Sequence, residues 1–137
     1  TRHKLKYLLW SAIVSLSLAS CMKWDYGDAV EEFNASGAGL FITNEGNFQY
    51  GNATLSYYDP ATKTVQNEIF FRANGMKLGD VAQSMTIYDN KGWVVVNNSH
   101  VIFAIDLNTF KEVGRIENLT SPRYIHFLEM EEHTSEL

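Results

Sequence analysis

"GWVVVNNSHVIFAIDLNTFKEVGRIENLTSPRYIHF", residues 92–127, contains four short segments that are rich in β-branched and aromatic residues. Gly, Asn, Asp and Pro separate these segments, which is typical of turns between strands. The whole chain has eight such segments, at residues 39–43, 54–59, 65–71, 84–89, 92–98, 101–107, 112–117 and 123–128. Short strands at regular spacing predict an all-β domain, which is a sandwich, a barrel or a propeller.

Comparison of the chain with itself decides among these three architectures. The matching pairs are SYYDPATKTV (56–65) with FAIDLNTFKEV (103–113), GLFITN (39–44) with GWVVVN (92–97), and QSMTIY (83–88) with PRYIHF (122–127). The shifts between the members of these pairs are 47, 53 and 39 residues. A shift near 40 residues is the period of a four-stranded propeller blade.

An Asp-x-x-Thr turn follows the third strand of each repeat. Asp59 aligns with Asp106, and Thr62 aligns with Thr109. An Asp at the first position of a turn accepts a hydrogen bond from the backbone two residues on, and Pro60 presets the next backbone angle. We therefore expect the two aspartates to shape turns rather than to act as catalytic acids.

The unit at residues 92–127 resembles the YVTN-type β-propellers, in which a strand that ends in Asn precedes a hydrophobic strand running into IDxxT. The resemblance covers residues 5–128 and implies about two four-stranded antiparallel blades, at 37–128, of a propeller that has about seven. The first blade lacks an inner strand before Gly39. Two blades leave sheet edges open, so we expect marginal stability.

The first 36 residues have the pattern of an export signal followed by a tether. TRHKLK is basic, residues 7–20 are uncharged and mostly apolar, and Cys21 follows directly. This order predicts a helical signal peptide at 1–20. LASC resembles the lipobox of bacterial lipoproteins, which implies that Cys21 carries a lipid. The acidic stretch behind it, within 21–36, resembles the tether of surface-exported lipoproteins.

Together, the lipobox and the repeats resemble the surface propeller lipoproteins of gut Gram-negative bacteria. These are often labelled surface-layer or domain-of-unknown-function proteins. Some members bind cobalamin and pass it to a TonB-dependent outer-membrane transporter. The resemblance implies a lipid-anchored protein of the outer membrane that faces the cell surface. The acidic tail at 129–137 lacks a strand pattern and resembles a truncated or frameshifted end.

Two insertions predict a ligand-binding face. The first blade has six extra residues within 45–54 and eight within 70–82, in loops that should emerge on the same face. The candidate ligand-binding residues are Asn47, Phe48, Tyr50, Asn52, Arg72, Asn74 and Lys77. Amides, aromatic rings and cations suit cobalamin, which has amides, a planar ring and a phosphodiester, but they also suit a glycan. Alternatively, the Asn residues shape turns and the aromatic rings cover the blade edge.

Composition and motifs argue against several other functions. The net charge of −5 disfavours nucleic acid, and CxxC, HExxH, Walker and GxSxG motifs are absent from the sequence. The four histidines, His3, His100, His126 and His133, are isolated and predict no metal site. We therefore expect a binding protein that has no cofactor and is not an enzyme. The alternatives are a structural surface-layer or complex-assembly subunit, and a propeller enzyme such as a lyase or a quinoprotein-like dehydrogenase.

Overall fold

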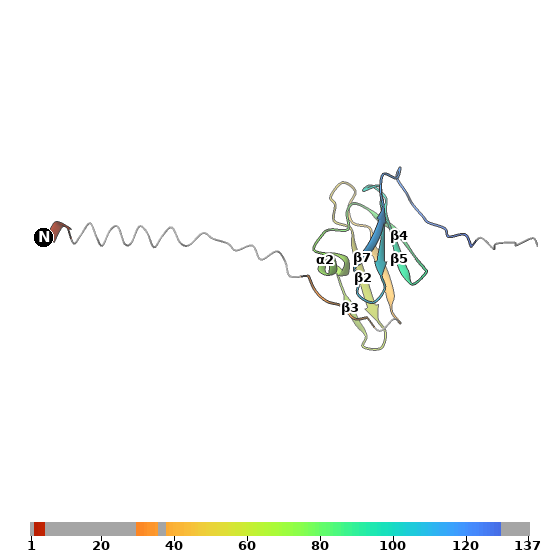
Figure 1. The fold of residues 1–137 in the computed structure, drawn as a ribbon, viewed down its shortest axis with the longest axis horizontal. Helices are drawn as coiled ribbons and strands as arrows, with labels where there is room; N and C mark the ends of the chain where they lie inside the picture. Colours follow the sequence, from red (N-terminus) through yellow and green to blue (C-terminus); the bar gives the residue numbers. More distant parts are fainter. Residues whose placement is uncertain (1, 5–29, 36–37, 130–137) are drawn as a thin grey trace, which may run out of the picture.

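A computed structural model describes residues 2–4, 30–35 and 38–129 of the chain (Figure 1). Its elements are β1 (Leu40–Asn44), β2 (Thr54–Asp59), β3 (Thr64–Gln66), α2 (Ile69–Asn74), β4 (Ala82–Tyr88), β5 (Lys91–Val96), β6 (Val101–Asp106) and β7 (Glu112–Ile116). The strands form two antiparallel sheets, in the orders β1-β2-β3 and β4-β5-β6-β7. The expected all-β class is confirmed.

Several predictions fall on residues that the structure does not describe. Most of the predicted signal peptide, the proposed lipid attachment residue Cys21 and the tail from 130 onward lie outside the described residues. Within the described ranges, no helix combines the length and the apolar character that crossing a bilayer requires.

The two sheets repeat one strand order. In each, consecutive strands pair antiparallel with their neighbours in sequence, so that β1-β2-β3 corresponds to β5-β6-β7. The second sheet has β4 as an additional strand beside β5, joined to it through a tight turn in which Asp89 and Asn90 both have positive φ. In the described residues no strand occupies the corresponding place beside β1, as the position of Gly39 predicted.

The two Asp-x-x-Thr turns have the predicted structural role. Asp59 accepts a hydrogen bond from the Ala61 N–H at 2.8 Å. Asp106 accepts bonds from the backbone N–H groups of Asn108 at 2.9 Å and of Thr109 at 2.8 Å. These bonds to the carboxylate, that of Thr109 first, lower the pKa of Asp106 below its usual value. The turns are built alike because the same residue type performs the same local bonding.

The prediction of one strand over residues 65–71 was wrong. Strand β3 ends at Gln66, and α2 begins at Ile69. Glu68 in a left-handed conformation turns the chain before α2, and Gly75 ends the helix by donating its N–H to the Phe71 carbonyl. Helical spacing lets α2 bury Ile69, Phe70 and Ala73 on one side. Burial of this face outweighs the strand propensity of the local sequence.

The strand predicted at residues 123–128 is also absent. The segment lies along the second sheet, where the Ser84 hydroxyl donates to the Arg123 carbonyl at 2.6 Å and Phe127 stacks on Tyr88 at 4.1 Å. No strand in the described part of the chain pairs with it. A strand exists only through its hydrogen-bonded neighbours, so the apolar pattern alone does not produce one here.

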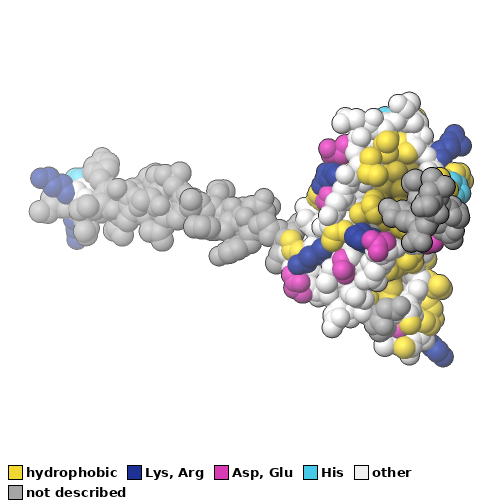
Figure 2. Space-filling view, turned by 45° about the vertical axis from the view of Figure 1, so that its right-hand side comes forward, with side chains coloured by type: hydrophobic (Ala, Val, Ile, Leu, Met, Phe, Trp, Pro, Cys, Tyr) yellow, Lys and Arg dark blue, Asp and Glu magenta, His cyan; other side chains and the backbone are white. Residues whose placement is uncertain are grey.

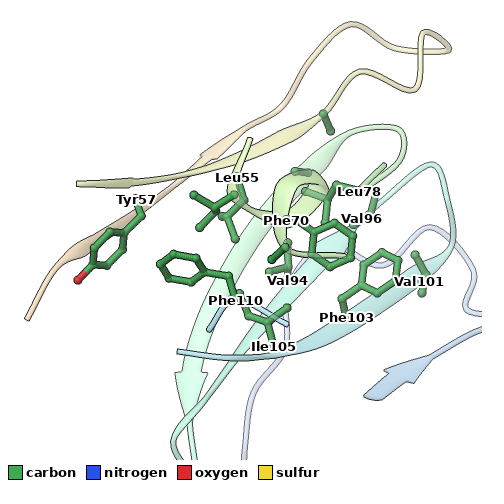
Figure 3. Packing of buried hydrophobic residues seen from close by; sticks show 14 residues of the cluster. Leu55, Tyr57, Phe70, Leu78, Val94, Val96, Val101, Phe103, Ile105 and Phe110 are labelled. Atoms are coloured by element: carbon green, nitrogen blue, oxygen red, sulfur yellow. The ribbon is translucent and has the colours of Figure 1, made fainter. Parts of the chain in front are cut away.

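One hydrophobic core joins the two sheets and α2. In Figure 3 the side chains of Leu55, Phe70 and Phe103 point into a shared interior from β2, α2 and β6. The ring of Phe110 lies 5.2 Å from that of Tyr57 and 5.8 Å from that of Phe41. Phe110 follows β6, while Phe41 and Tyr57 lie on β1 and β2. The turn after β6 therefore packs against the first sheet.

Residues 30–35, assigned above to the tether, contact the domain. The Glu31 carboxylate pairs with Arg72 at 2.7 Å, and Glu32 pairs with Lys111 at 2.6 Å. Phe33 packs on Phe110, with ring centroids 5.1 Å apart. The segment thus connects α2 to the turn between β6 and β7, and at least this part of the predicted tether belongs to the folded domain.

Candidate functional site

The loop between β1 and β2 carries the first insertion and closes on itself. Asn52 accepts a hydrogen bond from the Asn47 N–H at 2.8 Å through its side-chain oxygen. Tyr50 donates its N–H to the Asn47 carbonyl at 3.0 Å. Gly46 has φ +75°, and a Cβ there would lie 2.6 Å from Asn52 Oδ1, so the close approach requires glycine. Asn52 therefore shapes the loop, as the turn-forming alternative proposed.

The structure brings the two insertions together on one face, as the repeat alignment predicted. The Ala53 N–H donates to the Gly79 carbonyl at 3.1 Å, which forms a bridge between the loop before β2 and the segment before β4. The Gln49 N–H reaches the carboxylate of Asp80 at 2.8 Å. Because each contact joins one insertion to the other, the two form a single surface.

Asp80 holds this surface together, although the sequence analysis did not single it out. Its carboxylate is buried and accepts from Gln49 N–H and, at 2.6 Å, from the amide of Asn98. Its N–H donates to the Ser99 hydroxyl at 2.9 Å. The side chain thereby links both insertions to the turn after β5. The signal in the sequence is an acidic residue placed directly before an apolar strand within an insertion.

A partly open pocket of about 150 Å³ lies between the two insertions. Its walls are formed by Gly51, Asn52, Ala53, Thr54, Leu55, Glu68, Phe70, Phe71, Lys77 and Leu78. Leu55, Phe70 and Leu78 are buried members of the core, so the floor of the pocket is apolar. Asn52, Thr54, Glu68 and Lys77 contribute polar groups to its walls. An apolar hollow with a few polar groups is the usual form of a small-molecule site.

Two of the predicted ligand residues line this pocket, and three project elsewhere. Asn52 and Lys77 lie in its walls. Asn47, Phe48 and Tyr50 lie on the outer part of the first insertion, where the side chains of Phe48 and Tyr50 are 62% and 75% exposed. Figure 2 shows apolar side chains reaching the surface of the domain on one face. The two aromatic rings are free to cover a ligand that is larger than the pocket.

The remaining two predicted residues, Arg72 and Asn74, are engaged within the protein. Arg72 donates to both carboxylate oxygens of Glu31, at 2.9 and 2.7 Å, and lies 5.0 Å from the centre of the Phe33 ring. The bond to Glu31 raises the pKa of Arg72 and lowers that of Glu31. Ligand contact by Arg72 stays a prediction, and a ligand would have to compete with Glu31 for the Arg72 guanidinium.

Asn74 uses both ends of its amide to hold α2 against the second sheet. Its nitrogen donates to the carbonyls of Phe70 at 2.9 Å and Phe110 at 3.1 Å. Its oxygen accepts from the Glu112 N–H at 2.8 Å. The amide therefore bridges the insertion helix and the turn after β6, and its role as a ligand contact likewise stays a prediction.

The described histidines serve no shared site. His100 accepts a hydrogen bond from the Ser121 N–H at 3.1 Å through Nδ1, and His126 is exposed. Among the described residues no group of three or more His, Cys, Asp or Glu side chains is placed to hold a metal ion.

Comparison with known proteins gives a family but no activity. No curated protein matches the chain. A family model described as a domain of unknown function (DUF5074) matches residues 38–136, which is well over half of the sequence and includes both sheets and both insertions. The chain therefore belongs to the DUF5074 family.

Proposed function

We propose that the chain is a non-catalytic, ligand-binding surface lipoprotein whose two sheets are neighbouring blades of a β-propeller. In this proposal Cys21 carries the lipid that anchors the protein to the outer membrane. The ligand face consists of the two insertions, and its ligand is cobalamin, which a TonB-dependent transporter would then receive.

The support for the propeller is the repeated packing of one sheet against the next element along the chain. Strand β4, which begins the second sheet, contacts β1 of the first. Residues 122–127 lie against the second sheet in the same way, with the Asn97 amide donating to the Pro122 carbonyl at 2.8 Å and Phe127 next to Trp93. Each sheet is thus followed by a segment packed against the first strands of that sheet, β1 in one and β4 and β5 in the other, as expected for successive blades.

The single observation that supports ligand binding is the junction of the two insertions. Two loops that the repeat does not need meet through the Ala53–Gly79 bridge and enclose an apolar pocket. Binding groups are commonly carried by loops on a rigid scaffold. The pocket is too small for a corrin ring, so cobalamin would lie across the face and use the exposed rings of Phe48 and Tyr50.

Calorimetric titration of the protein with cyanocobalamin tests this function. We expect a dissociation constant of about 1 µM or below. Loss of both exposed rings in Phe48→Ala/Tyr50→Ala should weaken binding about thirtyfold, since each aromatic contact contributes roughly 1 kcal/mol. Tyr124→Ala is the matched control because Tyr124 is 68% exposed but lies outside the insertions. Absence of any corrinoid binding would refute cobalamin as the ligand, while binding of a glycan would move the proposal to carbohydrates.

A complex-assembly subunit is the second candidate, and exposed apolar side chains on strands favour it. Leu40 on β1 and Ile87 on β4 are 61% and 58% exposed. Apolar strand surfaces of this kind are suited to contact another protein chain. Gentle solubilisation of membranes followed by affinity purification separates the candidates. Co-purification with a transporter without any small-molecule binding would favour assembly over ligand capture.

A further inference from the structure

A second hollow lies next to the pocket between the insertions. It is an open groove of about 530 Å³ near the turn after β5 and the end of β7. Lys77 and Leu78 line both hollows, so these two residues form the wall between them. A ligand that fills one hollow could therefore place a substituent over Lys77 and Leu78 into the other hollow.

The pocket on one side of the wall has the size and polarity for a single ring. Its volume of about 150 Å³ equals that of an apolar cavity known to accept benzene. Ala53, Leu55 and Phe70 are at most 4% exposed and supply apolar atoms at its base. The pocket therefore suits one aromatic ring, and it has no room for a bicyclic group with substituents.

The groove on the other side offers cationic and neutral donors. Arg115 and Glu117 line it, but the Arg115 guanidinium pairs with Glu112 and, at 3.5 Å, with Glu117, so these two carboxylates outweigh its charge and Arg115 offers no free cation. Lys77 forms no ion pair within the part of the chain that the structure describes. His100 accepts the Ser121 N–H at Nδ1, so neutral His100 bears its proton on Nε2 and is a donor there.

We propose that the two hollows form one site for a small anion that carries a single aromatic ring, such as an aryl phosphate or aryl carboxylate. The ring fills the pocket, and the anionic group pairs with Lys77 at the wall, on the side where His100 adds a second donor. This assignment rests on the proposed function, since it takes the joined insertions as a ligand face, and it adds a site for a smaller ligand beside the exposed rings proposed to contact cobalamin.

Titration with phenyl phosphate, followed by calorimetry and by amide chemical shifts, tests the assignment. Benzoate is the carboxylate counterpart and distinguishes the two kinds of anion. Benzyl alcohol supplies the ring without the charge, and inorganic phosphate supplies the charge without the ring. We expect at least one of the two aryl anions to bind at least tenfold more tightly than either of these partial ligands. The shifts should concentrate on residues 51–55 and 77–79.

Two variants separate the contribution of the anionic group from that of the aromatic ring. Lys77→Gln should weaken binding of the aryl anion about tenfold, since one charged hydrogen bond is lost. Lys63→Gln is the matched control, because Lys63 is also an exposed lysine without an ion pair in the described residues and lies outside both hollows. Ala53→Met places a longer side chain in the pocket and should abolish preference for the ring. If Ala53→Met fails to fold, Lys77→Gln still decides the outcome.

The assignment would be overturned if neither phenyl phosphate nor benzoate bound more tightly than benzyl alcohol, or if Lys77→Gln left binding of the aryl anion unchanged. Binding of inorganic phosphate alone, which requires no pocket, would also overturn it. Parallel titration with cyanocobalamin distinguishes the two proposals. Cobalamin binding without aryl anion binding refutes this site but leaves the ligand-binding function in place. Aryl anion binding without cobalamin binding supports the site and refutes cobalamin as the ligand.

Discussion

The turn after β2 and the turn after β6 occupy the same place in the two repeats but contribute differently to the fold. Both begin with an aspartate that accepts backbone hydrogen bonds. Both contain a residue in the left-handed conformation at the same repeat position, Lys63 with φ 56° and Phe110 with φ 61°. Lys63 is exposed, whereas Phe110 is 1% exposed and packs against the first sheet.

The difference between these turns separates local from tertiary information. The Asp-x-x-Thr pattern determines the backbone of the turn in both repeats, because its hydrogen bonds are internal to the turn. The residue at the left-handed position decides whether the turn also holds the two sheets together. Only the second turn has a large apolar side chain there. Packing of the first sheet therefore depends on this side chain from the second repeat.

Removal of the aromatic ring at the second turn should have the largest effect. Phe110→Ala leaves a cavity among Phe33, Phe41 and Tyr57, and we expect a loss of about 3–5 kcal/mol in the free energy of unfolding. Lys63→Ala, the equivalent change in the first turn, should alter it by less than about 0.5 kcal/mol. Urea denaturation measures both. Equal effects of the two substitutions would contradict the comparison.

An intermediate effect is expected from the amide that fixes the second turn. Asn74→Ala removes bonds to the Phe110 carbonyl and the Glu112 N–H, which should cost about 1–3 kcal/mol. Hydrogen exchange at the Glu112 amide should accelerate with it. Asn34→Ala, at an exposed position, is the control. A stable variant with unchanged exchange at Glu112 would show that α2 does not brace this turn.

The smallest effect should come from the two turn aspartates. Asp106→Ala should cost about 1 kcal/mol, and Asp59→Ala less, because Asp106 accepts more hydrogen bonds within its turn. The hydrogen bonds hold the pKa of Asp106 below its ordinary value. Because folding lowers the pKa of Asp106, its carboxylate adds to the free energy of unfolding at any pH above the unfolded-state pKa, which is near 4. This contribution disappears as the pH falls through the lower pKa of the folded state.

The pH dependence provides the control for this third prediction. Asp106→Asn retains an acceptor but cannot be deprotonated, so the stability difference from the unsubstituted protein should be complete above about pH 5 and vanish toward about pH 2. Thermal melts across this range measure the difference. A difference that grows on acidification would have the wrong sign and would exclude the carboxylate as its cause.

The strand order was predictable from sequence, but α2 was not. The shifts of 53 and 47 residues between repeats correctly identified β5 as the equivalent of β1, and β6 as the equivalent of β2. Ile69 and Phe70 favour strands by propensity, and only their burial between the sheets selects a helix. The segment at 123–128 has a strand pattern but lacks a partner strand in the described residues. A strand pattern in the sequence therefore predicts a strand only where the fold also supplies a neighbouring strand for it to pair with.

Part of the candidate site was also predictable. The two insertions lie together because strand direction alternates, which the repeat alignment already implied. The engagement of Arg72 depends on Glu31, which lies 41 residues earlier and outside the repeat. Asp80 similarly depends on Gln49 and Asn98, which are distant in sequence. Whether a polar side chain is free or engaged is a tertiary property that no local pattern reveals.

The attachment of residues 30–35 determines where mechanical load enters the domain. Glu31 and Glu32 hold this segment to Arg72 on α2 and to Lys111 after β6. Under the lipoprotein proposal, tension from the membrane would reach these two ion pairs first and would shear them along the domain surface. Arg72 lies five residues before Lys77, which lines the proposed ligand face. The anchor and the proposed ligand face would thus be connected through α2 and the residues that follow it. A pull on the tether would act on α2 before it acts on any strand.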